Sequence, residues 1–137
     1  MSDKNGKANF TRVLGNTTGS HLSGAKDAPY GDLEQFQVDV VCFRDILPSI
    51  QFAKIDVEGH EANLILSTQG DDWKNFECVL EVGTENNRKA IFEHCKRLNL
   101  NMFSQKIGWE KVQSLSDAPC SYKEGSLFIS KAAKMPW

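Results

Sequence analysis

Residues 52–66 read FAKIDVEGHEANLIL, and the hydrophobic pattern of this stretch changes in the middle. The residues up to Val57 suit a β-strand, whereas the apolar residues after Gly59 recur at helical spacing. We expect this helix to end near Gly70. The stretch therefore predicts a strand that leads directly into a helix. Three carboxylates and one imidazole gather where the two elements meet, namely Asp56, Glu58, His60 and Glu61.

The segments around this stretch extend the pattern to an α/β fold. Apolar runs predict strands over 8–15, 36–43, 51–57, 73–83, 101–107 and 125–131. A helix is expected over 86–100, and a single helical turn over 44–50 ends at Pro48. Polar residues predict loops over 15–31 and 114–125. This order predicts parallel strands joined by helical crossovers, a C-terminal antiparallel hairpin, and pairing between the first two strands.

Length and composition exclude several classes of protein. A chain of 137 residues that is 40% hydrophobic can bury one core, so we expect a single domain. Its 18 acidic and 16 basic residues give a formal charge of -2, so we expect neither nucleic acid nor membrane as a partner. No apolar run approaches the roughly 20 residues of a membrane span and no signal-peptide pattern is present, so we expect a cytoplasmic protein. The cysteines form no C-x-x-C pair, which argues against a zinc knuckle or a disulfide framework.

The carboxyl ends of the predicted strands indicate a binding site. Ligands of open α/β sheets bind beyond these ends, and Asp56, Glu58 and Glu81 are expected there on one edge. A helix start brings unpaired N–H groups to the same edge, and Gly59 permits close approach of a ligand or of backbone. Lys54 is expected to pair with an acid or to extend from the strand edge. The edge is therefore an acidic candidate site beside a helix start.

The stretch KIDVEGHE at 54–61 resembles the K-I-D-V-E-G-x-E signature of the FkbM-type S-adenosylmethionine-dependent methyltransferases. In that family the signature runs from the fourth strand of a Rossmann-like sheet into the following helix. VDVVCFRDIL at 38–47 resembles the segment that leads into the signature. FECVLEVG at 76–83 resembles the fifth strand with its terminal acid, and EGSLFIS at 124–130 resembles the last, antiparallel strand. The resemblance covers about the final two thirds of the chain, in order.

The upstream part of the chain departs from the family pattern. Family members begin with a strand and a glycine-rich turn for the methionine end of the cofactor, then a second strand whose terminal acid takes the ribose hydroxyls. Neither is recognisable in this sequence. The glycines at 15, 19 and 24 lie in a polar segment rather than between an apolar strand and a helix, so they do not match such a turn. A P-loop fails as well, since Ala25 stands where lysine is required. We therefore expect one partial methyltransferase domain over 1–137, with a strand and polar loop at 1–37 and a strand-helix core at 38–137.

The resemblance implies roles for individual residues. Methyl transfer needs a nucleophile in line with the sulfonium of S-adenosylmethionine, and often a base that removes the proton of the nucleophile. The implied catalytic residues are Asp56 and Glu58. The implied cofactor contacts are Asp56, Gly59 and Ser20, the last because GNTTGSHLSG at 15–24 resembles a Gly-Ser-Ser loop upstream of the signature. The implied reaction is O-methyl transfer to a sugar or another small-molecule acceptor.

Three further residues are candidates at the same site, namely Lys54, Glu61 and Glu81. For Glu61 a simpler explanation competes, because the helix dipole stabilises an acid in the first helical turn. A divalent metal is an alternative ligand for Asp56, Glu58, His60 and Glu61. The spacing disfavours it, since His60 and Glu61 lie around a turning backbone, and we expect no metal. A phosphatase-like D-x-D-x-T site fits poorly, because Glu58 and His60 replace its second Asp and its hydroxyl residue.

A non-catalytic function is the main alternative to methyl transfer. Without the strands that hold the cofactor, the rest of the pattern predicts a small α/β scaffold with an exposed sheet edge. Such a scaffold would bind a complementing N-terminal half or form a homodimer. Cofactor affinity separates this alternative from the enzyme.

Overall fold

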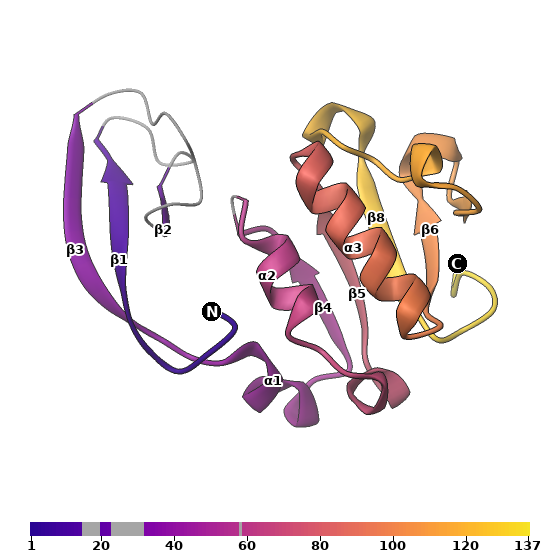
Figure 1. Cartoon of the computed structure of the whole chain (residues 1–137), viewed down its shortest axis with the longest axis horizontal. Helices are drawn as coiled ribbons and strands as arrows, with labels where there is room; N and C mark the ends of the chain where they lie inside the picture. The colour runs from indigo at the N-terminus through magenta and orange to yellow at the C-terminus, as the bar shows by residue number, and fades with distance from the viewer. Residues whose placement is uncertain (15–19, 23–31, 58) are drawn as a thin grey trace.

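An antiparallel sheet of three strands forms the N-terminal part of the protein. The computed structural model describes residues 1–14, 20–22, 32–57 and 59–137. β1 (Gly6–Val13) pairs along its length with β3 (Leu33–Val40), and β2 (His21–Leu22) pairs with the other edge of β1. This sheet extends away from the rest of the molecule (Figure 1). The predicted pairing of the first two strands is confirmed. β3 begins earlier than expected and runs across the expected division of the chain at residue 38.

A mixed sheet of five strands forms the body of the protein, in the order β4-β5-β8-β6-β7. The strands are β4 (Phe52–Ile55), β5 (Glu77–Glu81), β6 (Asn101–Ser104), β7 (Glu110–Lys111) and β8 (Ser126–Ser130). β4 and β5 are parallel, and β8 lies antiparallel between β5 and β6. The α/β class, the parallel crossover and the C-terminal antiparallel pair are confirmed. The short strand β7, antiparallel to β6, was not predicted.

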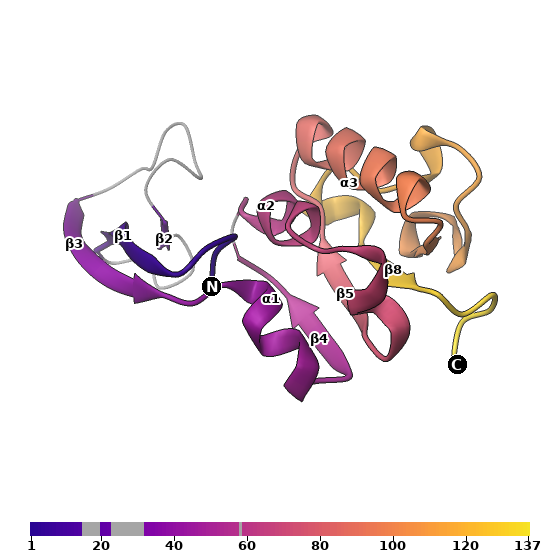
Figure 2. The ribbon, with the colours of Figure 1, turned by 60° about the horizontal axis from the view of Figure 1, so that its bottom comes forward.

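The α-helices of the described residues are α1 (Phe43–Ile46), α2 (Glu61–Leu66) and α3 (Glu85–Arg97). Helices α2 and α3 pack together on one face of the five-stranded sheet (Figure 2). Thr84 begins α3 as an N-cap, since its hydroxyl oxygen accepts the N–H of Asn87 at 3.2 Å. Short 3-10 turns occupy 47–49, 70–74, 105–107, 115–117 and 122–124. None of the helices in the described ranges is long and apolar enough to cross a membrane.

Helix α2 ends at Leu66, which corrects the expected end near Gly70. The hydroxyl of Thr68 donates to the carbonyl of Ile65 at 2.7 Å. A local side-chain bond of this kind competes with the hydrogen bonds that would continue the helix. Gln69 then adopts extended backbone, with φ of -124° and ψ of 166°, and caps the 3-10 turn that follows. The polar residues after α2 therefore end it four positions before glycine is reached.

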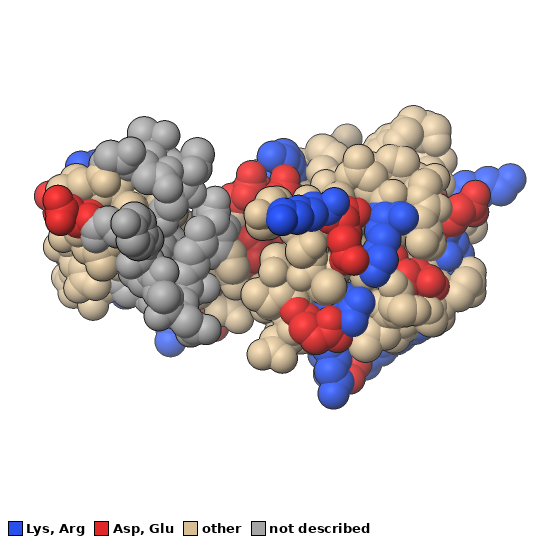
Figure 3. Space-filling model, turned by 90° about the horizontal axis from the view of Figure 1, so that it is seen from above, with Lys and Arg blue, Asp and Glu red and all other residues tan. Residues whose placement is uncertain are grey.

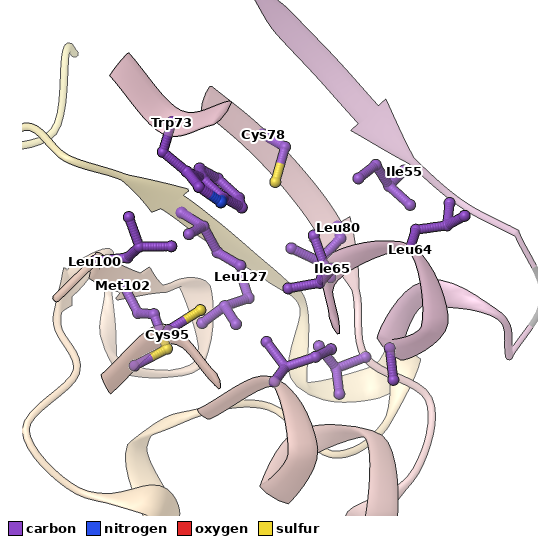
Figure 4. Close-up of a cluster of buried hydrophobic side chains, with 14 of the residues drawn as sticks. Ile55, Leu64, Ile65, Trp73, Cys78, Leu80, Cys95, Leu100, Met102 and Leu127 are labelled. Carbon is purple, nitrogen blue, oxygen red and sulfur yellow. The ribbon is translucent and has the colours of Figure 1, made fainter. Parts of the chain in front are cut away.

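Apolar side chains from the sheet and from both longer helices form one core (Figure 4). Its labelled members are Ile55, Leu64, Ile65, Trp73, Cys78, Leu80, Cys95, Leu100, Met102 and Leu127. Complete burial of a large aliphatic side chain contributes about 1.5–3 kcal/mol to folding. Ile55 and Leu80 are partners in the strand register, so the core continues from β4 into β5. The strand that carries the signature is therefore anchored from the helix side.

The opposite face of the sheet is partly covered by the last residue of the sequence. Phe128 of β8 and Phe103 of β6 are partners in the register, and their ring centroids lie 6.1 Å apart. Trp137 packs edge-on against Phe128, with 5.2 Å between ring centroids, and against Trp109 at 6.1 Å. Both phenylalanines are buried, whereas Trp137 is 68% exposed. The C-terminal segment thus folds back over the sheet.

Candidate functional site

Asp56 and Glu81 occupy matching positions at the carboxyl ends of two neighbouring parallel strands. The register pairs Ile55 with Leu80, so the next residues, Asp56 and Glu81, lie at the same carboxyl edge. Strands β4 and β5 point upward in Figure 1, and Figure 3 shows the molecule from above. On this face, acidic and basic side chains are intermixed over the body. The expected edge is therefore formed by adjoining strands. Glu58 lies outside the described residues.

Asp56 presents its carboxylate to solvent. Its Oδ2 lies 3.2 Å from Lys54 Nζ, and the two side chains are 45% and 63% exposed. An ion pair this exposed contributes between about 0 and 1 kcal/mol, so Lys54 does not hold Asp56 rigidly. Lys54 therefore pairs with an acid, as expected. The carboxylate of Asp56 remains accessible to a ligand that donates a hydrogen bond or a proton.

Glu61 faces inward, toward the turn that precedes its own helix. Glu61 is only 3% exposed. Its Oε1 accepts the N–H of Val57 at 3.2 Å and that of Gly59 at 3.0 Å. Gly59 has a φ of 97°, a conformation that residues with a Cβ rarely adopt. The turn therefore requires glycine at this position. The carboxylate of Glu61 organises the turn and does not point into solvent.

Asn87 joins this turn to the other helix. Its Nδ2 donates to the carbonyl of Gly59 at 3.2 Å and to Oε2 of Glu61 at 3.4 Å. Sequence reasoning missed Asn87, because 26 residues separate it from Glu61 and an asparagine near a helix start has a sufficient local explanation. One signal could have found it: Asn87 lies in the first turn of the helix that follows Glu81.

Ser20 lies next to the N-terminal sheet, whereas Glu81 belongs to the five-stranded sheet. Ser20 directly precedes β2, and its Oγ accepts the N–H of Val13 at 3.3 Å. This contact belongs to the N-terminal sheet. Glu81 is half-buried at the end of β5 and lies opposite Ser126 of β8. The described residues thus bring Asp56 and Glu81 to one edge, while Ser20 supports strand pairing elsewhere.

The segment before β8 adds fixed charges beside the start of α3. Glu124 accepts the N–H of Cys120 at 2.7 Å and pairs with Lys106 at 3.1 Å. These contacts, the backbone one foremost, lower the pKa of Glu124 to about 2. Arg88 of α3 pairs with Glu85, and its buried Nε has no hydrogen-bond partner among the described residues. Charges of both signs are therefore held in place near the edge.

A groove of about 800 Å³ lies between α1 and α2. Arg44 and Pro48 line it from the side of α1, and Asn63 and Leu66 line it from α2. Arg44 is already paired, since its Nε lies 2.9 Å from Oδ2 of Asp72. None of the described edge residues lines this groove. The groove is therefore distinct from the predicted site.

The residues considered for the alternative metal site do not converge in the described part of the chain. Over 1–14, 20–22, 32–57 and 59–137, no three His, Cys, Asp or Glu side chains are placed to hold a metal ion. Nε2 of His60 lies 3.4 Å from Nδ2 of Asn63, on the outer side of α2. Glu61 is directed into the turn. These two residues are thus engaged separately.

No family model, no curated protein and no solved structure matches this chain. The geometry of the carboxyl edge and the resemblance of KIDVEGHE are therefore the grounds on which a function can be proposed.

Proposed function

We propose that this protein carries the strand-helix part of a Rossmann-like, FkbM-type methyltransferase domain that uses S-adenosylmethionine. One observation carries the proposal: KIDVEGHE at 54–61 supplies a strand and a helix start, with Asp56 exposed at the carboxyl edge between them. The antiparallel β8 beside β5 adds support, because the resemblance expects an antiparallel last strand. The proposed reaction is O-methyl transfer to a sugar or another small metabolite.

The edge residues fit part of the cofactor. When bound, S-adenosylmethionine supplies an electrophilic methyl group on a positively charged sulfonium. Asp56 and Glu81 make the edge acidic, and carboxylates attract a cation and accept hydrogen bonds from hydroxyl groups. Within the described residues, no glycine-rich turn joins an apolar strand to a helix. These residues therefore suit the sulfonium and the acceptor, and offer no cradle for the methionine end.

Asp56 is the residue that we assign to the acceptor. A hydroxyl group becomes a better nucleophile when a base takes its proton as the new bond forms. The carboxylate of Asp56 is exposed, and Lys54 approaches it from the same strand. A hydroxyl can therefore reach the carboxylate from solvent. We assign the orientation of the same ligand to Glu81, which is half-buried on the adjoining strand.

A second observation favours the non-catalytic alternative. In the described part of the chain β4 pairs only with β5, so the main-chain groups on its other side are open to a further strand. Phe52 of β4 is 50% exposed. A complementing N-terminal half or a second copy of the chain could pair there. Sedimentation of wild type and Phe52→Glu tests self-association, because a dimer formed at this edge would dissociate in the variant.

Titration calorimetry with S-adenosylmethionine and S-adenosylhomocysteine tests the proposed function. We expect saturable binding to the wild-type chain, and binding weaker by about tenfold or more in Asp56→Ala, since a hydrogen bond to a charged group contributes about 1.5–3 kcal/mol. Asp71→Ala is the matched control, because Asp71 is 87% exposed and lies outside the edge. No binding to the wild-type chain at millimolar ligand contradicts a cofactor site on this chain. Equal binding by both variants contradicts the role of Asp56.

A further inference from the structure

The turn between β4 and α2 is held from two sides by one carboxylate and one amide. Oε1 of Glu61 accepts the N–H groups of Val57 and Gly59, and its Oε2 accepts a hydrogen bond from Asn87. Nδ2 of Asn87 also donates to the carbonyl of Gly59, so both of its amide hydrogens are used. The N–H and the carbonyl of Gly59 are thus bound by side chains from two different helices.

We propose that Glu61 and Asn87 are positioning residues that form one clamp and hold the turn after Asp56 at a fixed place relative to α3. Asp56 directly precedes Val57, whose N–H is one of the clamped groups. The clamp therefore joins the end of β4 to the first turn of α3. The clamp itself is a property of the turn and does not depend on the proposed function. Only its role in positioning Asp56, the carboxylate assigned to the methyl acceptor, rests on the proposed function.

The helix dipole alone does not explain the arrangement of Glu61. The dipole stabilises an acid in the first turn of a helix without requiring that both of its carboxylate oxygens accept hydrogen bonds. Glu61 is 3% exposed, and both of its carboxylate oxygens accept hydrogen bonds. A buried carboxylate is tolerated when donors satisfy it, and here the donors are the turn and Asn87. The neighbouring Asn86 is exposed, which makes it a matched control for substitution in α3.

Amide hydrogen exchange at Val57 and Gly59, followed by NMR on the full chain, tests the clamp. Asn87→Ala removes the amide that orients the carboxylate of Glu61. We expect exchange of the Gly59 N–H to be faster by about tenfold, the effect of losing one hydrogen bond to a charged group. Asn86→Ala is expected to leave this rate unchanged. An unchanged rate in Asn87→Ala would overturn the clamp.

A reciprocal exchange of the two side-chain types separates the clamp from a general loss of stability. Asn87→Asp sets a second carboxylate against Glu61, so we expect exchange faster than in Asn87→Ala. Adding Glu61→Gln provides an amide that donates to the new carboxylate. We expect the double variant to exchange about tenfold more slowly than Asn87→Asp alone, because paired sites are coupled. A double variant that exchanges as fast as Asn87→Asp would overturn the pairing.

Binding of S-adenosylhomocysteine to the same variants tests the link to Asp56. Weaker binding in Asn87→Ala, with wild-type binding in Asn86→Ala, supports positioning of Asp56 by the clamp. Equal binding in both variants overturns the positioning role. If the wild-type chain does not bind, the proposed function fails, and the exchange rates at Val57 and Gly59 still decide whether the clamp exists.

Discussion

The indole N–H of Trp73 donates to the hydroxyl oxygen of Thr68 at 2.9 Å, and both side chains are buried. The same hydroxyl donates to the carbonyl of Ile65 at 2.7 Å. Nε2 of His94 lies 3.3 Å from this oxygen, and Nδ1 lies 2.7 Å from Arg97. Because Arg97 can only donate, Nδ1 accepts, and the neutral ring carries its proton on Nε2, toward Thr68. Thr68 thus connects the end of α2 to α3 through the core.

Thr68→Val tests this connection, since valine keeps the shape of the side chain and lacks the hydroxyl. The buried donors of Trp73 and His94 would lose their acceptor. We expect the free energy of unfolding to fall by about 2–3 kcal/mol, because an unsatisfied buried donor costs about 1–3 kcal/mol. Urea unfolding followed by tryptophan fluorescence measures this change. The control Ser116→Ala, at an exposed position, should stay within about 0.5 kcal/mol of wild type, and a change this small in Thr68→Val would contradict the connection.

His94 predicts that stability falls as the solution becomes mildly acidic. Burial, with Arg97 as a second cause, lowers the pKa of His94 from its ordinary value of 6.5. Below pH 6.5 the unfolded chain therefore binds a proton at His94 that the folded chain does not bind. The loss of stability grows as the pH falls, and stops growing below the lowered pKa. Urea midpoints between pH 7.5 and 5, compared with those of His94→Gln, isolate this effect, and identical pH profiles would refute it.

Glu124 predicts a second loss of stability at lower pH. Its carboxylate accepts the N–H of Cys120 and pairs with Lys106, which lowers its pKa from 4.5 to about 2. The stability that Glu124 contributes is present above pH 4.5 and is lost as the pH falls toward about 2. We expect Glu124→Gln to be less stable than wild type at pH 6, and the two to converge near pH 2. The control Glu110→Gln changes an exposed acid, and the same convergence in that variant would argue against a specific effect of Glu124.

The cysteines predict two classes of thiol reactivity. Cys78 and Cys95 are buried, and burial raises the pKa of Cys95 to about 12 and that of Cys78 well above its usual range. Cys42 and Cys120 are half-buried, and a hydrogen bond to Glu124 raises the pKa of the Cys120 thiol. A disulfide reagent should therefore modify Cys42 first, Cys120 more slowly, and the buried pair only after unfolding. Modification of all four thiols at one rate in the native protein would contradict the packing of the core.

The sequence predicts the order of the elements well, because local pattern is sufficient for it. FAKIDVEGHEANLIL begins with the hydrophobic pattern of a strand and ends with that of a helix. The structure has the strand before the change of pattern and the helix after it. The place of β8 between β5 and β6 is not readable in this way, because strand pairing depends on contacts between distant segments. The predicted end of α2 near Gly70 was wrong, because glycine is the stronger helix-termination signal in a sequence. The hydroxyl of Thr68 instead competes with the hydrogen bonds that would continue the helix.

The candidate site was predictable in part, because the local sequence pattern shows where each strand ends. Asp56 and Glu81 end neighbouring strands, and the rule for open α/β sheets was enough to place both at one edge. The inward direction of Glu61 was not predictable, because it depends on the N–H groups of the turn and on Asn87, far away in the sequence. Ser20 was assigned by resemblance alone, and its observed contact is with Val13 in the other sheet.

Mapping the binding of S-adenosylhomocysteine on the isotope-labelled chain by NMR tests the central claim most directly. If the carboxyl edge is the cofactor side of a methyltransferase domain, the amide shifts will change in a saturable way at Asp56, Gly59, Glu81 and Gly83. Shift changes confined to the groove lined by Arg44 and Asn63, or none at millimolar ligand, would contradict it.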